Sequence, residues 1–181
     1  MHLMLTVGHG TLAQDAFVAL LQEAGVEVLV DVRSYPGSRR NPQYGREAME
    51  RWVADGGIEY RWEKAVGGRR KSVPDSRHHA LRHDAFRAYA DHMETAEFKA
   101  GLDRVLDASV ERRTAVMCSE SVWWRCHRRL LADAAVLLRD AEVVHLFHDG
   151  RLQPHPVTPE ARREGDDVVY DGGASSLPLP L

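Results

Sequence analysis

The chain has 181 residues, of which 44% are hydrophobic and 28% are charged, and its formal net charge at pH 7 is −3. These values are typical of a globular domain, and they exclude a protein that coats nucleic acid through bulk positive charge. No apolar run approaches the roughly 20 residues that span a bilayer, and the N-terminal stretch lacks the basic segment of a signal peptide. We therefore expect a cytoplasmic protein that does not contact membranes.

The first predicted elements are a strand, a helix and a second strand. Residues 3–7 form a short apolar run typical of a buried strand. Residues 11–14 have the spacing of a capping box and predict the start of a helix, which ends at Gly25. Residues 26–32 are a continuous branched run, as expected for a strand buried on both faces.

The middle of the chain continues this alternation. We expect a helix at residues 47–54 and a strand at residues 58–62, followed by a long loop over residues 63–80. Two helices are predicted next, at residues 85–93 and 97–107.

A strand at residues 114–117, a helix at residues 126–139 and a strand at residues 143–147 complete the pattern. Alternating strands and helices predict an α/β fold, with an open, mostly parallel sheet of about five strands. Helices should cover both faces of the sheet in a Rossmann-like three-layer arrangement.

The chain divides in composition near residue 150. We expect residues 1–150 to form a single α/β domain. Residues 151–181 are rich in Pro, Gly and charge and predict a C-terminal extension packed on the surface. Within it we expect one short strand at residues 168–170 and a disordered end at residues 175–181.

Both cysteines of the chain fall in one predicted strand-to-helix turn, AVMCSESVWWRCHRRLLA at residues 115–132. Cys118 ends the strand, and Cys126 opens the helix with His127 and Arg128 after it. The first N–H groups of a helix carry the positive end of its dipole, so this turn suits a bound anion or a thiolate. We expect the pKa of Cys126 to be lowered toward neutrality and Arg128 to bind a phosphate or carboxylate.

In an open parallel sheet, ligands collect beyond the carboxyl ends of the strands. Polar residues follow most of the predicted strands, and the topology should bring them to one rim. They are Gly8, His9, Asp31, Arg33, Cys118, Glu120, His145 and His148. Of the candidate residues, we expect His9 or His127 to exchange protons, and Glu120 or Asp31 to act as a second carboxylate or base.

These residues also have structural alternatives. Cys118 could fill the core, His9 could satisfy a backbone carbonyl, and Asp31 and Arg33 could form an ion pair that closes a strand. The Trp-Trp pair at residues 123–124 could be a hydrophobic plug or a stacking platform.

The loop sequence GGRRK at residues 67–71 lacks P-loop spacing, so it could either touch phosphates or move freely in solvent. The ten histidines do not assemble a standard zinc spacing, and we expect neither a metal nor another cofactor.

Several blocks resemble the family called domain of unknown function 488. They are TVGHGT, DVRSYPGSRRNPQY, GIEYRWEKAVGG, AVMCSE, CHRRLLAD and HPVTPEAR, and the resemblance extends from about residue 5 to 170. It implies an α/β fold and marks motif positions at Gly8, His9, Asp31, Arg33, Pro36, Ser38, Gly67, Gly68, Cys118, Glu120, Cys126, His127 and Arg128. Gly10 departs from the pattern, which more often has Ser, so Thr11 could supply the hydroxyl.

We interpret the sequence as that of an enzyme for a small anionic, phosphate-bearing ligand such as a nucleotide. Catalytic roles are expected for His9, Asp31, Cys118, Glu120, Cys126 and His127. Substrate-binding roles are expected for Gly8, Arg33, Ser38, Gly67, Gly68 and Arg128.

Two alternatives remain open. Residues 33–87 contain 13 Lys and Arg against 7 Asp and Glu, so this region could belong to a non-catalytic module that binds nucleic acid or protein. A thiol redox sensor made of Cys118 and Cys126 is the other alternative, and it requires the two thiols to come within disulfide reach. The sequence leaves the oligomeric state open.

Overall fold

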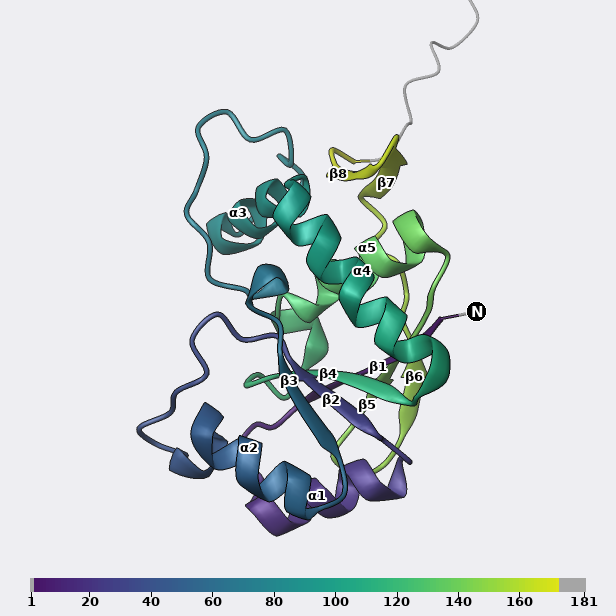
Figure 1. Cartoon of the computed structure of the whole chain (residues 1–181). Coiled ribbons are helices and arrows are strands. Elements are labelled where there is room, and N and C mark those ends of the chain that lie inside the picture. The colour runs from purple at the N-terminus through teal and green to yellow at the C-terminus, as the bar shows by residue number, and fades with distance from the viewer. Residues whose placement is uncertain (1, 173–181) are drawn as a thin grey trace, which may run out of the picture.

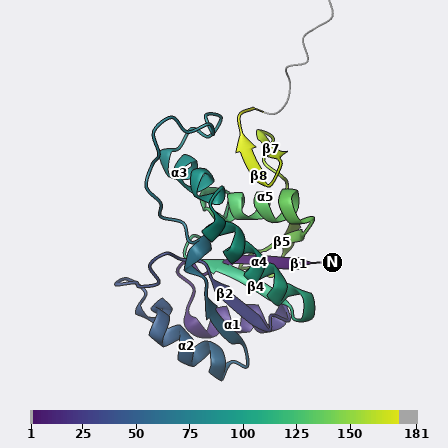
Figure 2. The ribbon, with the colours of Figure 1, turned by 45° about the horizontal axis from the view of Figure 1, so that its top comes forward.

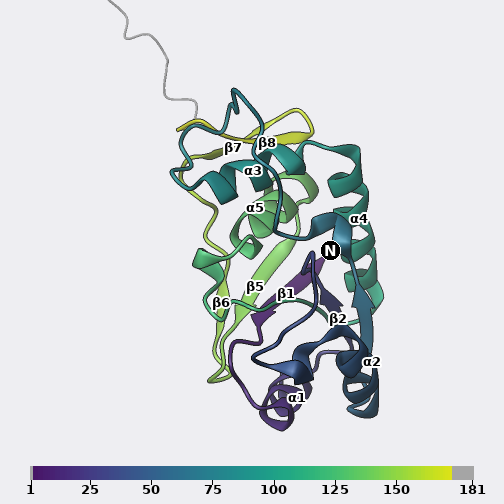
Figure 3. The same cartoon turned by 90° about the vertical axis from the view of Figure 1, so that its left-hand side faces the viewer.

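The computed structural model describes residues 2–172 and contains one sheet of five parallel strands with a sixth, antiparallel strand at its edge (Figure 1). The order across the sheet is β3-β2-β4-β1-β5-β6, and Figure 3 labels its members β6, β5, β1 and β2. The strands are β1 Leu3–Gly8, β2 Val28–Asp31, β3 Glu59–Trp62, β4 Thr114–Cys118, β5 Glu142–Leu146 and β6 Leu152–Pro154.

Helices cover both faces of the sheet (Figure 2). They are α1 Gln14–Glu23, α2 Arg46–Asp55, α3 Asp84–Met93, α4 Ala96–Glu111 and α5 Arg128–Arg139. The helices α1 and α2 pack on one face, while α3, α4 and α5 lie on the other. Three short 3-10 turns, η1 Pro42–Tyr44, η2 Lys64–Val66 and η3 Trp123–Arg125, lie in the loops. This architecture confirms the predicted three-layer α/β fold.

The alternation of side chains along the strands builds the two cores. Val28 and Val30 of β2 face the α3–α5 layer, and Leu29 between them faces α1 and α2. All four residues of β2 are buried, as expected for a strand covered on both sides. The edge strand β3 instead alternates exposed and half-buried residues.

The residues after the last parallel strand contribute to both the sheet and the α5 layer. β6 extends the sheet beyond β5, and a hairpin of β7 Ala161–Glu164 and β8 Asp167–Tyr170 packs on α3 and α5. Val168 and Tyr170 of β8 join the core on that side. The short strand expected at residues 168–170 is part of β8, whereas the end expected to be disordered, residues 175–181, lies outside the described residues. The division of the chain near residue 150 stays a prediction.

Two expected helix starts are wrong. No capping box forms at residues 11–14: Leu12 N–H bonds to the His9 carbonyl in a turn, and α1 begins at Gln14 with Ala13 as its N-cap. Likewise, Cys126 N–H closes the η3 turn on the Trp123 carbonyl, so α5 begins at Arg128 with His127 as its N-cap. In both places a tight turn after a strand uses residues that the pattern assigns to the helix.

Within residues 2–172, no helix combines the length and the apolar character that a bilayer crossing requires.

Candidate active site

The carboxyl ends of β1, β2 and β4 lie level with one another. Gly8 pairs with Cys118, and Asp31 pairs with Met117. Beyond the strands, the N–H of His9 donates to the Cys118 carbonyl at 3.0 Å. The segments that follow the three strands therefore open on one edge of the sheet, where ligands of parallel sheets bind.

A cleft of about 1140 Å³ lies at this edge. Its walls come from residues 9–11, 33–41, 68–70, 85–89 and 118–127, and His148 also contributes. Eight of the expected site residues line it: His9, Arg33, Ser38, Gly68, Cys118, Glu120, Cys126 and His127. The other four, Gly8, Asp31, Gly67 and Arg128, lie outside the lining.

The two cysteines meet on the α5 side of the cleft. The Sγ atoms of Cys118 and Cys126 lie 2.7 Å apart, within hydrogen-bond reach, and both residues are free thiols that are almost fully buried. The first backbone N–H of α5, that of Arg128, points at the Cys126 Sγ at 3.5 Å. The helix terminus is thus directed at a sulfur, although the helix begins two residues later than expected.

Arg128 is the largest fully buried side chain near the cleft, with 1% of its surface exposed. Its Nε donates to the Cys118 Sγ at 3.0 Å, and its Nη2 donates to the Glu120 carbonyl at 2.5 Å. No carboxylate forms an ion pair with this guanidinium within residues 2–172. Arginine keeps its charge in proteins, and a buried charge needs a counter-charge. The thiol pair is the adjacent group able to supply one.

The two thiols share this negative charge unequally. Burial raises the pKa of Cys118, and its hydrogen bond to Cys126 raises it further. Burial would also raise the pKa of Cys126, but the hydrogen bond from Cys118 and the nearby His127 and Arg128 lower it well below its usual range. The directions of these pKa shifts make Cys126 the more acidic thiol of the pair.

His127 lies beside the Cys126 sulfur in a fixed orientation. Its Nε2 is 3.0 Å from the Val32 carbonyl, and because a carbonyl only accepts, Nε2 carries a hydrogen. The other nitrogen, Nδ1, is 3.5 Å from the Cys126 Sγ and can receive or return a proton there. Gly68 packs against the ring: a Cβ at this position would lie 2.7 Å from Nδ1. Gly68 therefore has to be small for His127 to keep its place.

Asp31 and Arg33 form the structural pair that the sequence allows as an alternative. Asp31 is fully buried and receives two hydrogen bonds from the Arg33 side chain, at 2.8 and 2.6 Å, one from the Arg33 backbone N–H at 3.1 Å and one from the Tyr60 hydroxyl at 2.6 Å. The Arg33 Nη1 is left with one contact, at 3.5 Å, to the Nε2 of His9. Asp31 thus orients Arg33 from behind the cleft.

His9 is buried and stacked on Tyr44, with ring centroids 3.9 Å apart. Burial lowers its pKa to about 4, and the positive charge of Arg33 acts in the same direction. Its Nδ1 donates to the Gly10 carbonyl at 2.8 Å, so the neutral ring keeps a lone pair on Nε2. At neutral pH His9 is therefore a hydrogen-bond acceptor at the cleft, and it is a weaker base than expected.

The remaining expected residues shape the cleft. The exposed carboxylate of Glu120 lies on the rim, and Ser38 holds its loop by accepting the Asn41 N–H at 2.9 Å. Gly8 and Gly67 permit close packing, since a Cβ would lie 1.8 Å from the Glu120 carbonyl oxygen in the first case and 2.5 Å from the Ser34 Oγ in the second.

A family model with the description "Domain of unknown function DUF488" matches residues 13–135. The chain belongs to this family. The matched span includes the thiol pair, Asp31 and Arg128, whereas Gly8 and His9 precede it. Searches of curated proteins and of solved structures found no match.

A series of buried, hydrogen-bonded side chains lies behind the thiols of this DUF488 domain, and the sequence analysis did not predict it. Arg128 donates to Thr6, which contacts His145; His145 contacts His155, and His155 contacts Asp133, with distances of 3.3, 2.6, 2.9 and 2.8 Å. Because the carboxylate only accepts, the Nε2 of His155 carries a hydrogen and donates it to Asp133. The scattered positions of these residues in the sequence gave no signal for this series.

His145 belongs to that interior series and not to the rim, where it was expected. Burial, with the adjacent His155 and Arg128, lowers the pKa of His145 to about 3. Of the two alternatives for the tryptophan pair, Trp123 fits the hydrophobic plug. It is buried and stacks on His145, with ring centroids 4.2 Å apart. Trp124 is 45% exposed.

Most cationic side chains of the DUF488 cleft come from the basic region at residues 33–87, and only Arg125 lies outside it. Six arginines line the cleft, Arg33, Arg39, Arg40, Arg69, Arg70 and Arg125, against one carboxylate, Glu120. A further polar group is the Oγ of Ser34, which is buried at the cleft without a hydrogen-bond partner among residues 2–172.

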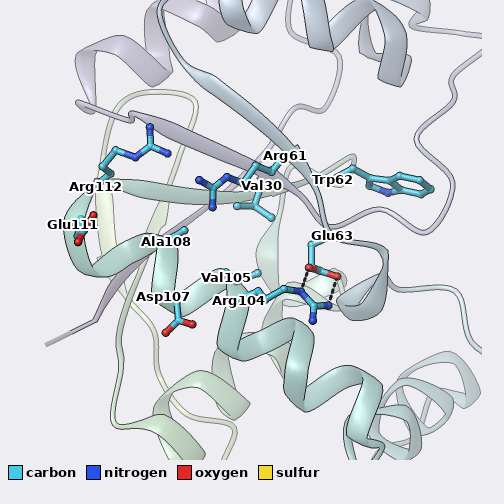
Figure 4. Close-up of a pocket in the computed structure, with 10 residues that line it drawn as sticks. All are labelled: Val30, Arg61, Trp62, Glu63, Arg104, Val105, Asp107, Ala108, Glu111 and Arg112. Carbon is cyan, nitrogen blue, oxygen red and sulfur yellow. Dashed lines mark hydrogen bonds and ion pairs between the residues drawn. The ribbon is translucent and has the colours of Figure 1, made fainter.

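A second hollow lies between β3 and α4 (Figure 4). Its lining has three arginines and three carboxylates, and Arg104 donates to both carboxylate oxygens of Glu63, at 2.8 and 3.0 Å. It contains neither a thiol nor a histidine among its described lining residues. The chemistry of the domain is therefore concentrated in the cleft at the strand ends.

Within residues 2–172, no three His, Cys, Asp or Glu side chains are grouped so that they could hold a metal ion.

Proposed function

We propose that the protein is an enzyme that binds an anionic, phosphate-bearing ligand in the cleft and uses Cys126 as its nucleophile. One observation carries the proposal: a cleft lined by six arginines and one carboxylate lies directly over a buried thiol pair. Cationic groups in a partly buried cleft favour phosphates, and a thiolate is the reactive form of cysteine.

Different residues of the cleft serve ligand binding and the chemical step. Arg39, Arg40, Arg69 and Arg125 are exposed and make no ion pair within residues 2–172, so they are free to contact the ligand. The Arg33 Nη1 and the unpartnered Ser34 hydroxyl supply donors deeper in the cleft.

The chemical step centres on Cys126. The first N–H of α5 and the Arg128 guanidinium keep its negative charge in place, and Cys118 donates a hydrogen bond to it. When Cys126 attacks a phosphorus of the ligand, an S–P bond forms and a P–O bond breaks. The leaving oxygen takes up the proton that the Cys126 thiol gave to His127 Nδ1 when it ionised, and water then hydrolyses the S–P bond. In this role Arg128 positions the thiols, and the ligand is bound by other arginines.

The binding half of the proposal is tested by thermal denaturation with inorganic pyrophosphate and with a nucleoside 5′-monophosphate. We expect both to raise the melting temperature, and the combined Arg69→Gln and Arg125→Gln substitutions to abolish the rise. Arg112→Gln is the control, because Arg112 precedes β4 at the end of the strands opposite to the cleft and pairs with Glu59. Melting shifts that survive the double substitution would refute the site.

The chemical half is tested by alkylation. Iodoacetamide should modify Cys126 before Cys118, and saturating pyrophosphate should slow the reaction. If Cys126 reacts no faster than a free thiol and the anion gives no protection, the nucleophile is wrongly assigned.

The short separation of the two sulfurs favours a second candidate function, thiol redox sensing. A disulfide between them would remove the thiolate and leave Arg128 without its counter-charge. This function needs no cleft ligand, so it predicts reversible oxidation that pyrophosphate and nucleotides do not affect.

A further inference from the structure

Five of the six arginines that line the cleft form no ion pair within residues 2–172, and the same holds elsewhere for Arg51, Arg82, Arg113, Arg128, Arg129 and Arg163. Elsewhere nine arginines form ion pairs with carboxylates: Arg46, Arg61, Arg77, Arg87, Arg104, Arg112, Arg139, Arg151 and Arg162. Arg39, Arg40, Arg69 and Arg125 all line the cleft and have no such partner within residues 2–172. The cleft therefore holds positive charge that the protein itself does not neutralise.

This charge is spread over three separate loops. Arg39 and Arg40 come from the loop before η1, Arg69 comes from the loop after η2, and Arg125 belongs to η3. In Figure 1 the first two loops extend from the same side of the sheet. One phosphate can use one or two arginines, so charges on three loops match a ligand with several phosphates along a chain. The cleft volume, about 1140 Å³, exceeds the roughly 300–1,000 Å³ of small-molecule sites.

An exposed aromatic ring stands among these arginines. Tyr35 lines the cleft and is 67% exposed, an unusual exposure for a large ring. The Lys64 Nζ lies 5.6 Å from the centre of this ring. Aromatic faces next to a cationic groove are the elements with which proteins bind unpaired nucleotides, because a base stacks on the ring while the backbone follows the charges.

We propose that the ligand of the cleft is a single-stranded nucleic acid, with its phosphates on Arg39, Arg40, Arg69 and Arg125 and a base stacked on Tyr35. This inference rests on the proposed function and names its substrate class. A base can stack on Tyr35 only when it has left its own duplex, which excludes double-stranded ligands. DNA and RNA share the chemistry that this site recognises.

The test is fluorescence anisotropy of the full chain with labelled 12-nucleotide strands, oligo-dT and oligo-rU, at several salt concentrations. A dT–dA duplex of the same length serves as the comparison, and thymidine monophosphate and pyrophosphate serve as competitors. We expect the single strands to bind at least tenfold more tightly than the duplex and the monophosphate. The slope of log affinity against log salt should be about −3, because each of four phosphate contacts contributes about −0.7. Comparing the affinities for oligo-dT and oligo-rU shows whether the site prefers DNA or RNA.

Substitutions locate the contacts. Arg69→Gln should make the salt slope less steep by about 0.7, whereas Arg112→Gln at the opposite end of the strands should leave it unchanged. Tyr35→Ala should weaken binding roughly 5- to 150-fold without changing the slope, and Tyr35→Phe should retain the affinity, because stacking needs the ring and not the hydroxyl.

Two results would overturn the inference, and they separate it from the proposed function. If the monophosphate or the duplex binds as tightly as the single strands, the proposal of a single-stranded nucleic acid ligand is wrong, while the cleft is still an anion site. If no probe, pyrophosphate included, binds in the cleft, both proposals fail.

Discussion

The Nε of Arg128 donates a hydrogen bond to the Sγ of Cys118 over 3.0 Å, and both side chains are almost completely buried. A guanidinium stays charged under these conditions, and no carboxylate pairs with it within residues 2–172. We propose that its charge is balanced by a thiolate at Cys126, whose sulfur lies 2.7 Å from the Cys118 sulfur. The arginine and the two thiols therefore form one electrostatic unit at the cleft.

Removing the charge of Arg128 should damage this unit. Arg128→Gln leaves the thiolate without its counter-charge, so we expect the pKa of Cys126 to rise and its alkylation at pH 7 to slow at least tenfold. Breaking a buried charge pair should also lower the free energy of unfolding by about 3 kcal/mol. Alkylation rates and urea unfolding measure both effects.

Arg129→Gln is the matched control, because the Nε of Arg129 bonds to the Thr158 hydroxyl and contacts no sulfur. Equal alkylation rates in the two variants would show that Arg128 does not control the thiolate.

Gly68 should be essential for the position of His127. Gly68→Ala places a methyl group 2.7 Å from the His127 Nδ1, so the ring must move away from Cys126. We expect the pH dependence of Cys126 alkylation to change while the fold remains intact. Gly37→Ala on the same cleft is the control, since nothing lies within 4 Å of the added carbon. Identical pH profiles for both variants would contradict the role of His127.

The fold could be predicted because the buried strands carry a local signal. Continuous branched runs such as that of β2, separated by amphipathic helices, favour a parallel sheet. The convergence of His9, Arg33 and Cys118 followed from the same topology, because each residue follows or ends a parallel strand.

The functions of individual side chains could not be predicted in this way. Whether Arg128 points into the cleft or behind it depends on where α5 begins, and a 3-10 turn shifts that start by two residues. The series of hydrogen bonds from Thr6 to Asp133 joins residues up to 139 positions apart in the sequence, and no local sequence pattern indicates such contacts. Which arginines are unpaired depends likewise on tertiary neighbours.

Acid should destabilise the fold through its buried histidines. Burial lowers the pKa of His9 to about 4 and that of His145 to about 3, below the ordinary 6.5. Between pH 7 and pH 5 the unfolded chain therefore binds more protons than the folded one, and stability falls with pH. Each of these histidines should lower the free energy of unfolding by about 2 kcal/mol between pH 7 and pH 5.

Urea unfolding at the two pH values measures the loss, and His9→Gln should reduce it by about 2 kcal/mol. An unchanged loss in this variant would mean that His9 does not titrate as its burial indicates.

The hairpin β7–β8 should stabilise the site through Asp133. The Tyr170 hydroxyl donates to the Asp133 carboxylate at 2.8 Å, and His155 donates to its other oxygen. Tyr170→Phe should cost about 1.5–3 kcal/mol in urea unfolding, because it removes one hydrogen bond to a buried charge. Arg162→Gln tests the hairpin surface and should cost less than 1 kcal/mol. Equal losses would show that the Asp133 contact contributes nothing specific.

Mild hydrogen peroxide should join the two cysteines. The Cys126 thiolate attacks the peroxide to give a sulfenic acid and hydroxide, which takes up a proton from solvent, and the Cys118 thiol then displaces water from the sulfenic acid to form a disulfide. Mass spectrometry should show an intramolecular loss of two hydrogens that a dithiol reductant reverses. Cys118→Ser should stop at the sulfenic acid. Oxidation of the unsubstituted chain without that loss would rule out the redox function.

The central claim is that a thiolate exists at the cleft at neutral pH, and ultraviolet absorbance at 240 nm, where thiolates absorb, measures it directly between pH 4 and pH 10. We expect the folded chain to show the absorbance of one thiolate already at pH 7, and Cys126→Ser to lose it. The chain unfolded in guanidinium should ionise both thiols near the ordinary pKa of about 8.5. A folded chain that shows no thiolate until that same pH would contradict the account.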